Sequence, residues 1–157
     1  SIKYRQTLAQ AWWTLGDCYN HHYIGNDYSM AKEYYLKSIN LYTDLAVQQP
    51  EKHGLDLAEK YVTLGIFYKI IMHDDSKAKD SEAKAVENYF TALECSTNKL
   101  LQDPECDTEE WNSLMLIPSH DNYSDSWSII RKLLDDKRIK DFFLKTLDLM
   151  IQKEEKN

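Results

Sequence analysis

The chain is poor in the residues that interrupt regular structure. Its 157 residues include only four glycines and three prolines. Loop-rich and all-β folds use far more of both, because these two residues shape turns. No segment alternates strictly between apolar and polar residues, which is the pattern of a half-buried strand. We therefore expect an all-α fold without a sheet, formed by one domain over residues 1–157.

Cysteines and long apolar runs are also scarce. The three cysteines are odd in number and form no C-x-x-C pair; they are Cys18, Cys95 and Cys106. This favours reduced thiols and a cytoplasmic setting. No apolar run is long enough to span a bilayer and no signal peptide is evident, so we expect no membrane partner. The chain begins at Ser1 rather than Met, and we expect it to be a piece of a longer protein.

Positive charge and recognisable chemical motifs are missing as well. The net charge is −7 and no basic stripe is present, so nucleic acid is not an expected partner. There is no phosphate-binding glycine loop, no G-x-S-x-G and no locally supported Cys–His pair. We therefore predict no catalytic residues, no cofactor and no enzyme activity, and a helical enzyme is only a third alternative.

Histidines are the one group that could suggest a metal. Adjacent histidines on a helix point about 100° apart, so the pair at 21 and 22 is not a bidentate ligand. No H-E-x-x-H motif occurs. We predict no metal site at any of the histidines, which are His21, His22, His53, His73 and His120.

What the sequence does have is helical periodicity. Apolar residues recur at spacings of three and four in about seven segments. The expected helices cover about 2–23, 28–48, 55–72, 77 or 81 to 101, a segment from 107 or 108 to Pro118, one from 124 or 125, and a last one before a frayed end at 153–157. Residues 77–82 are so polar that they form either the start of the fourth helix or a mobile loop.

Short residues mark the expected helix ends. We predict that Gly25-Asn26-Asp27 stops the first helix, with Gly25 in a left-handed conformation and Asp27 capping the second helix. Pro50 is expected to end the second helix. Gly54 is expected to close the connection to the third.

One motif occurs twice. Thr-Leu-Gly-x-x-Tyr is found at 14–19 and 63–68, and each copy is followed by Ala-x-Glu-x-Tyr, at 31–35 and 85–89. Two matched motifs in the same order indicate an internal repeat. Gly16 and Gly65 fall in mid-helix, where glycine costs about 1 kcal/mol relative to alanine. We therefore expect another helix to cross closely at each glycine.

The chain resembles a tetratricopeptide repeat (TPR) protein. The pattern of that family is W-x2-L-G-x2-Y followed by A-x3-F/Y-x2-A. The matching residues are Trp12, Leu15, Gly16, Tyr19, Ala31, Tyr35 and Ser38 in one copy, and Tyr61, Leu64, Gly65, Tyr68, Ala85, Tyr89 and Ala92 in the other. The resemblance covers residues 5–102.

This resemblance implies an α-α superhelix, a TPR-like solenoid. Two long helical hairpins, 2–48 and 55–102, would be followed by a degenerate third repeat or capping helices over 107–157. The family period is 34 residues, whereas Leu15 and Leu64 are 49 apart and Ala31 and Ala85 are 54 apart. In this the chain is similar to the long-helix variants of bacterial repeat proteins. An insertion at 74–84 accounts for part of the difference.

In the family, the first helix of each hairpin lines a concave groove that holds a protein or peptide. The resemblance therefore implies a non-enzymatic binding scaffold. The corresponding groove candidates here are Gln10, Trp13, Asp17, Asn20, His21, Glu59, Val62, Ile66, Lys69 and Ile70. Because Trp12 and the stripe Leu8, Leu15 and Tyr19 are expected to face the core, Trp13 would point about 100° away. It would either anchor the partner or be covered by an upstream repeat or by a cap.

The ligand class and the wider role are less defined. The lysine and asparagine of the family's carboxylate clamp are replaced by Trp13 and Asp17, so a hydrophobic or mildly basic peptide fits better than an acidic tail. The alternative is a structural or regulatory solenoid arm of a larger protein that carries a sensor, nuclease or NTPase domain. The sequence does not predict the oligomeric state.

Overall fold

Helices take up most of the residues that the computed structural model describes, which are 1–25, 27–119 and 125–156. These residues form seven α-helices and no strand, so the all-α prediction is confirmed for them. The helices are α1 (Ile2–Asn20), α2 (Tyr28–Gln48), α3 (Pro50–Ile66), α4 (Asp75–Gln102), α5 (Glu109–Leu116), α6 (Ser126–Leu133) and α7 (Asp136–Glu155). A π-helical turn, η1 (Phe67–Ile71), extends α3, and a short 3-10 turn, η2 (Ile117–Ser119), follows α5.

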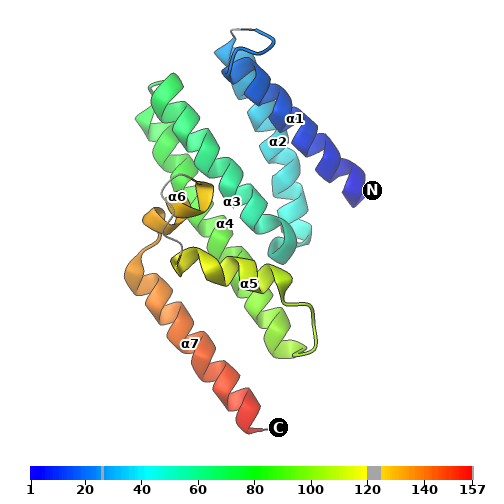
Figure 1. Ribbon diagram of the computed structural model, residues 1–157, viewed down its shortest axis with the longest axis vertical. Coiled ribbons are helices and arrows are strands. Elements are labelled where there is room, and N and C mark those ends of the chain that lie inside the picture. The colour runs from blue at the N-terminus through cyan, green and yellow to red at the C-terminus, as the bar shows by residue number, and fades with distance from the viewer. Residues whose placement is uncertain (26, 120–124, 157) are drawn as a thin grey trace.

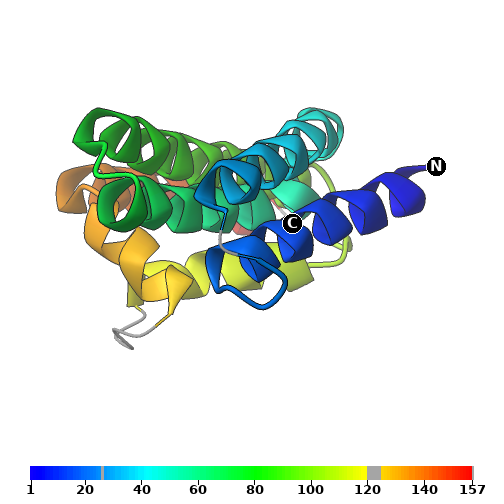
Figure 2. The same cartoon turned by 90° about the horizontal axis from the view of Figure 1, so that it is seen from above.

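Successive helices pack against one another. Figure 1 shows α1 beside α2 and α3 beside α4, with α5 crossing in front of α4 and α7 extending to the opposite end of the molecule from α1. Seen from above, α2 and α4 lie along one side and α1, α5 and α6 along the other (Figure 2). One buried cluster joins α1, α2 and α3, and a second joins α3 and α4 to the C-terminal helices. None of the described helices is both long and apolar enough to cross a membrane.

The second-helix motif occupies the centre of each cluster. In the first copy the buried residues are Ala31, Tyr35 and Ser38, and in the second Ala85, Tyr89 and Ala92. The phenol groups are not left unpaired, because the Tyr89 hydroxyl donates a 2.8 Å hydrogen bond to the Leu114 carbonyl. The predicted cap at Asp27 is confirmed: its carboxylate accepts a 3.1 Å bond from the Met30 amide.

Pro50 is the first residue of α3 rather than part of a connection between α2 and α3. α3 begins at Pro50, five residues earlier than expected, and only Gln49 separates it from α2. Proline is tolerated in the first turn because the amide it lacks would have no helical partner there. Gly54 is therefore not part of a connection. It lies inside α3, where a Cβ would be 2.6 Å from the Cβ of Ala92 on α4.

Three further helix ends differ in position from those expected. α1 stops at Asn20, and the left-handed residue after it is His22, with φ 62°, while Gly25 has an ordinary φ. α4 begins at Asp75, earlier than expected, and of the two alternatives for the polar residues 77–82 the helical one is confirmed; the inner face there is buried. α7 continues to Glu155 instead of fraying from Lys153. The predictions for Asn26, His120 and Ser124 concern positions outside the described residues.

The first helix buries a different face from the one expected. Ala9, Trp13 and Gly16 are buried, whereas the predicted core residue Trp12 is only half-buried. Trp13 is 5% exposed and its ring centroid lies 4.4 Å from that of Tyr35. Trp12 instead stacks on Tyr34 at 5.4 Å, at the edge of the hairpin. The prediction that Trp13 points away from the core is wrong.

The repeat explains part of this difference. Leu57 and Leu64 of α3 and Tyr68 of η1 are buried in the cluster that includes α2. The residues at the same repeat positions of α1 are Leu8, Leu15 and Tyr19, and all three are half-buried. Within the described part of the chain, no helix lies on α1 as α2 lies on α3. The same motif position is therefore core in one hairpin and edge in the other.

The two motif glycines also differ. A Cβ on Gly16 would lie 2.6 Å from the ring of Tyr35, so the predicted close crossing is confirmed there. At Gly65 the nearest atom to such a Cβ is the Ala78 carbonyl oxygen, 3.4 Å away. That is an ordinary contact distance. The backbone of α4 therefore also crosses close to Gly65, but it leaves room for a Cβ there.

Candidate functional site

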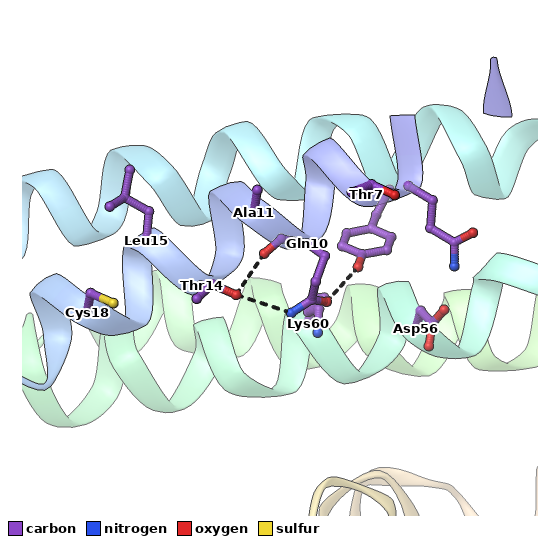
Figure 3. Close-up of a pocket in the computed structure, with 10 residues that line it drawn as sticks. Thr7, Gln10, Ala11, Thr14, Leu15, Cys18, Asp56 and Lys60 are labelled. Carbon is purple, nitrogen blue, oxygen red and sulfur yellow. Dashed lines mark hydrogen bonds between the residues drawn. The ribbon is translucent and has the colours of Figure 1, made fainter. Parts of the chain in front are cut away.

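A groove runs between α1 and α3. Its cavity volume is about 790 Å³. The residues that line it are Gln6, Thr7, Gln10, Ala11, Thr14, Leu15 and Cys18 of α1, Tyr42 of α2, and Asp56 and Lys60 of α3. The α1 residues recur at spacings of three and four, so they share one face of that helix. Figure 3 shows this face of α1 opposite Asp56 and Lys60.

Polar side chains of the groove form a connected network. The Tyr42 hydroxyl donates a 3.1 Å hydrogen bond to the Gln10 side-chain oxygen, and Thr14 donates a 3.0 Å bond to the Gln10 carbonyl (Figure 3). The Gln10 amide nitrogen in turn lies 3.4 Å from the Thr14 hydroxyl. Burial, with a further contribution from the charge of Asp56, raises the pKa of Tyr42 to about 12. Tyr42 therefore remains a hydrogen-bond donor at neutral pH.

Asp56 is the charged group with fewest partners in the groove. It is partly buried, and within the described residues its carboxylate makes no hydrogen bond or ion pair. Burial raises its pKa, against the opposing effect of Lys60 and His53. A carboxylate in this position has lost hydration without receiving protein donors in return.

The ammonium group of Lys60, on α3, lies against aromatic rings of α1 and α2. Its Nζ lies 5.0 Å from the centroid of the Trp13 ring and 5.6 Å from that of Tyr42. Such a cation–π position fixes the ammonium group at the inner side of the groove. The groove thus combines one fixed cation, one under-solvated anion and neutral amide and hydroxyl groups.

Of the predicted groove residues on α1, only Gln10 lines this groove. Trp13 is in the core. Asp17 and Asn20 are hydrogen-bonded to the buried Tyr35. The Tyr35 hydroxyl donates a 2.7 Å hydrogen bond to the Asp17 carboxylate and accepts a 3.2 Å hydrogen bond from the Asn20 side-chain amide. His21 is exposed at the end of the helix. Asp17 and Asn20 therefore satisfy the hydroxyl of a buried phenol.

The predicted residues of α3 lie on other faces of that helix. Glu59 accepts a hydrogen bond from the indole of Trp127 on α6, and burial raises its pKa while this bond lowers it. Val62 is buried. The remaining three are exposed near the C-terminal end of α3 and in η1, outside the residues that line the groove: Ile66, Lys69 and Ile70.

The prediction missed the groove because it placed α1 about 100° out of register around its own axis. With Trp13 facing inward, Gln6, Gln10 and Thr14 fall on the groove side at intervals of four. The small residues Ala9 and Gly16 could have given this orientation, because they flank Trp13 at four and three residues. No sequence signal of this kind places Asp56 in the groove, because its position depends on α3 starting at Pro50.

No metal-binding arrangement is found among the described residues, since no three side chains of His, Cys, Asp or Glu are grouped for it. Cys18, Cys95 and Cys106 are free thiols. No protein-family model, no curated protein and no solved structure matches the chain.

His53 is a buried polar residue on the same helix as Asp56. It is 1% exposed, and neither of its ring nitrogens has a hydrogen-bond partner among the described residues. Burial lowers its pKa, and the charge of Lys52 acts in the same direction, while Asp56 and Glu51 oppose it. The folded chain therefore holds this imidazole neutral.

Acidification should destabilise the fold through His53. Below the unfolded-state pKa of about 6.5, the unfolded chain takes up a proton that the folded chain does not. The free energy of unfolding should fall by at most about 1.4 kcal/mol per pH unit from this group, until its lowered folded pKa is reached. Asp56 and Glu59, whose pKa values are raised, act in the opposite direction at lower pH.

Urea unfolding at pH 7.5 and 5.5 would measure the effect. His53→Leu should be at least as stable as the native chain at pH 7.5, because it removes two unpaired buried nitrogens, and it should lose less stability at pH 5.5. His21→Leu, at an exposed histidine, serves as the control. An equal pH dependence in the native chain and His53→Leu would show that His53 is not the group responsible.

Proposed function

We propose that the chain is a non-enzymatic binding module that holds a peptide segment with a basic residue in the groove between α1 and α3. The observation that carries the proposal is the unpaired, partly buried carboxylate of Asp56 in a groove of about 790 Å³. The TPR-like repeat pattern of the sequence supports the same class of function. In this proposal the ligand is protein rather than nucleic acid.

The charge of the ligand follows from Asp56. A lysine or arginine side chain would give this carboxylate the partner that it lacks among the described residues. Hydrogen bonds between charged partners contribute roughly 1.5–3 kcal/mol when both are partly desolvated. Binding would also lower the pKa of Asp56, because a nearby cation favours the ionised form. Lys60 is already held by two rings and would oppose a second cation beside itself, so the ligand's basic group is placed on the Asp56 side.

The ligand backbone would be recognised by neutral groups of α1. Gln6 makes no hydrogen bond within the described residues, and its amide offers both donors and an acceptor. The Gln10 amide nitrogen has only a long contact with Thr14 and retains a second hydrogen to donate. Ala11 and Leu15 supply apolar surface between these groups. Such a lining suits an extended segment with exposed peptide groups.

Asp56→Asn should weaken binding of a basic peptide by about tenfold or more, while the fold is retained. Peptides would be selected by phage display on the purified chain and their affinities measured by fluorescence anisotropy. Each selected peptide would also be made with its basic residues changed to glutamine. Asp56→Asn combined with the glutamine peptide should lose no more than either change alone, because both remove the same interaction.

Two further variants separate the groove from its charge. Asp80→Asn removes one negative charge from the exposed face of α4 and should bind normally. Ala11→Trp would fill the groove with a bulky ring and should abolish binding of any groove ligand. If the selected peptides lack basic residues but their binding is still blocked by Ala11→Trp, the role of Asp56 is contradicted while the groove remains the binding site. Peptides that bind Ala11→Trp unchanged would contradict the groove itself.

A further inference from the structure

The outer face of α7 carries an uncovered apolar row. Leu144 is 56% exposed, Leu147 is 55% exposed and Ile151 is 48% exposed. Their spacings of three and four place them on one stripe of the helix. Lys140 and Glu154 extend the same stripe at its two ends, and both are exposed. Exposed leucines are ordinary one at a time, but a continuous row along a helix marks a surface that another element can cover.

The opposite face of α7 is already committed to α4. Ile139 and Thr146 are buried, and the ring of Phe142 lies 6.4 Å from that of Phe90. Arg138 makes two hydrogen bonds to Glu87, at 2.6 and 3.3 Å. Lys153 donates to the Leu101 carbonyl near the other end. Because these contacts fix the rotation of the helix, the apolar row is held facing outward.

The charges of α7 are divided along its length. Apart from Arg138 and Lys153, which bond α4, residues 136–145 contain three basic and two acidic side chains, whereas residues 146–155 contain three acidic side chains and no basic one. Two parallel copies would place like charges together. Two antiparallel copies would place the basic half of each against the acidic half of the other.

We propose that two copies of this chain associate through α7, packed antiparallel on the row of Leu144, Leu147 and Ile151. An antiparallel helix pair has two-fold symmetry, and the same patch is used on both copies. Centred near Leu147, this arrangement brings Lys140 of each copy close to Glu154 of the other. The groove contains no residue of α7, so the proposed interface uses none of the residues that line the groove.

A single helix pair is a small interface, so the association is expected in the micromolar range. Sedimentation velocity over micromolar to submillimolar concentrations should show a monomer–dimer equilibrium. Leu147→Glu should raise the dissociation constant at least about a hundredfold, because the change occurs twice in each interface. Leu144→Glu is a second variant with the same expected direction. Circular dichroism checks that each variant folds, which is expected because both leucines are more than half exposed in the monomer.

Val47→Glu is the matched control. Val47 lies on α2 and is 76% exposed, so it gives the same change of charge on another apolar surface residue. A native chain that stays monomeric at every concentration would overturn the proposal. A dimer that Val47→Glu disrupts while Leu147→Glu leaves it intact would overturn it too.

The antiparallel packing of the two α7 helices can be tested separately. Lys140→Glu and Glu154→Lys should each weaken the dimer about tenfold, since each places like charges opposite one another at two symmetric positions. The two changes in one chain should restore the native affinity. Weakening by both single changes without restoration would contradict the antiparallel arrangement.

Discussion

Trp13→Ala should lower the free energy of unfolding by about 3–5 kcal/mol. The indole is 5% exposed, packs 4.4 Å from Tyr35 and belongs to the cluster that joins α1, α2 and α3. Removing it would leave a cavity between three helices and would also free Lys60 from the ring on which it lies. Because whole domains are stable by only about 5–15 kcal/mol, this loss is a large share of the total.

Trp12→Ala is the matched control, one residue away. Trp12 is half-buried at the hairpin edge, between Tyr34 and the ammonium of Lys37, and its loss should cost clearly less. Urea unfolding followed by circular dichroism would compare the two. A larger loss for Trp12→Ala would mean that α1 buries the other face. The comparison also shows why a loss of binding in Trp13→Ala would report on folding rather than on a ligand contact.

Sequence periodicity predicted the helices more accurately than their orientations. Spacings of three and four identify a helix but do not decide between two apolar stripes that lie about 100° apart. α1 has both: one contains Leu8, Trp12 and Leu15, and the other contains Ala9 and Trp13. The larger stripe was expected in the core. It lies at the edge because no helix covers it within the described residues, and such an absence leaves no trace in the residues of α1.

The second helix of each hairpin was easier to orient. α2 is packed between α1 and α3, and α4 packs against α3 and the C-terminal helices, so the motif residues of both are enclosed. Alanines at 31 and 85 and tyrosines at 35 and 89 were therefore predicted in the core and are buried. The groove could not be predicted in the same way. Its two walls come from α1 and α3, and the position of the α3 wall depends on Pro50 acting as a helix start.

The motif glycines should respond in opposite ways to alanine. Gly16→Ala should lower the free energy of unfolding by about 2 kcal/mol, because the new Cβ would lie 2.6 and 2.7 Å from two carbons of the Tyr35 ring. That ring has Trp13 on one side and Phe67 at 5.4 Å, so it has little room to move. Gly65→Ala meets nothing closer than 3.4 Å and should raise stability by up to about 1 kcal/mol through helix propensity.

Urea unfolding of the two variants beside the native chain would measure this difference. Gly54→Ala is a second test of crowding, since its Cβ would lie 2.6 Å from Ala92 and 3.3 Å from the carbonyl of Asn88, and it should also destabilise. Equal losses at positions 16 and 65 would mean that the two glycines serve the same close crossing after all. Opposite signs would show that one repeated motif supports two different packings, because only Gly16 has an aromatic ring pressed against its backbone.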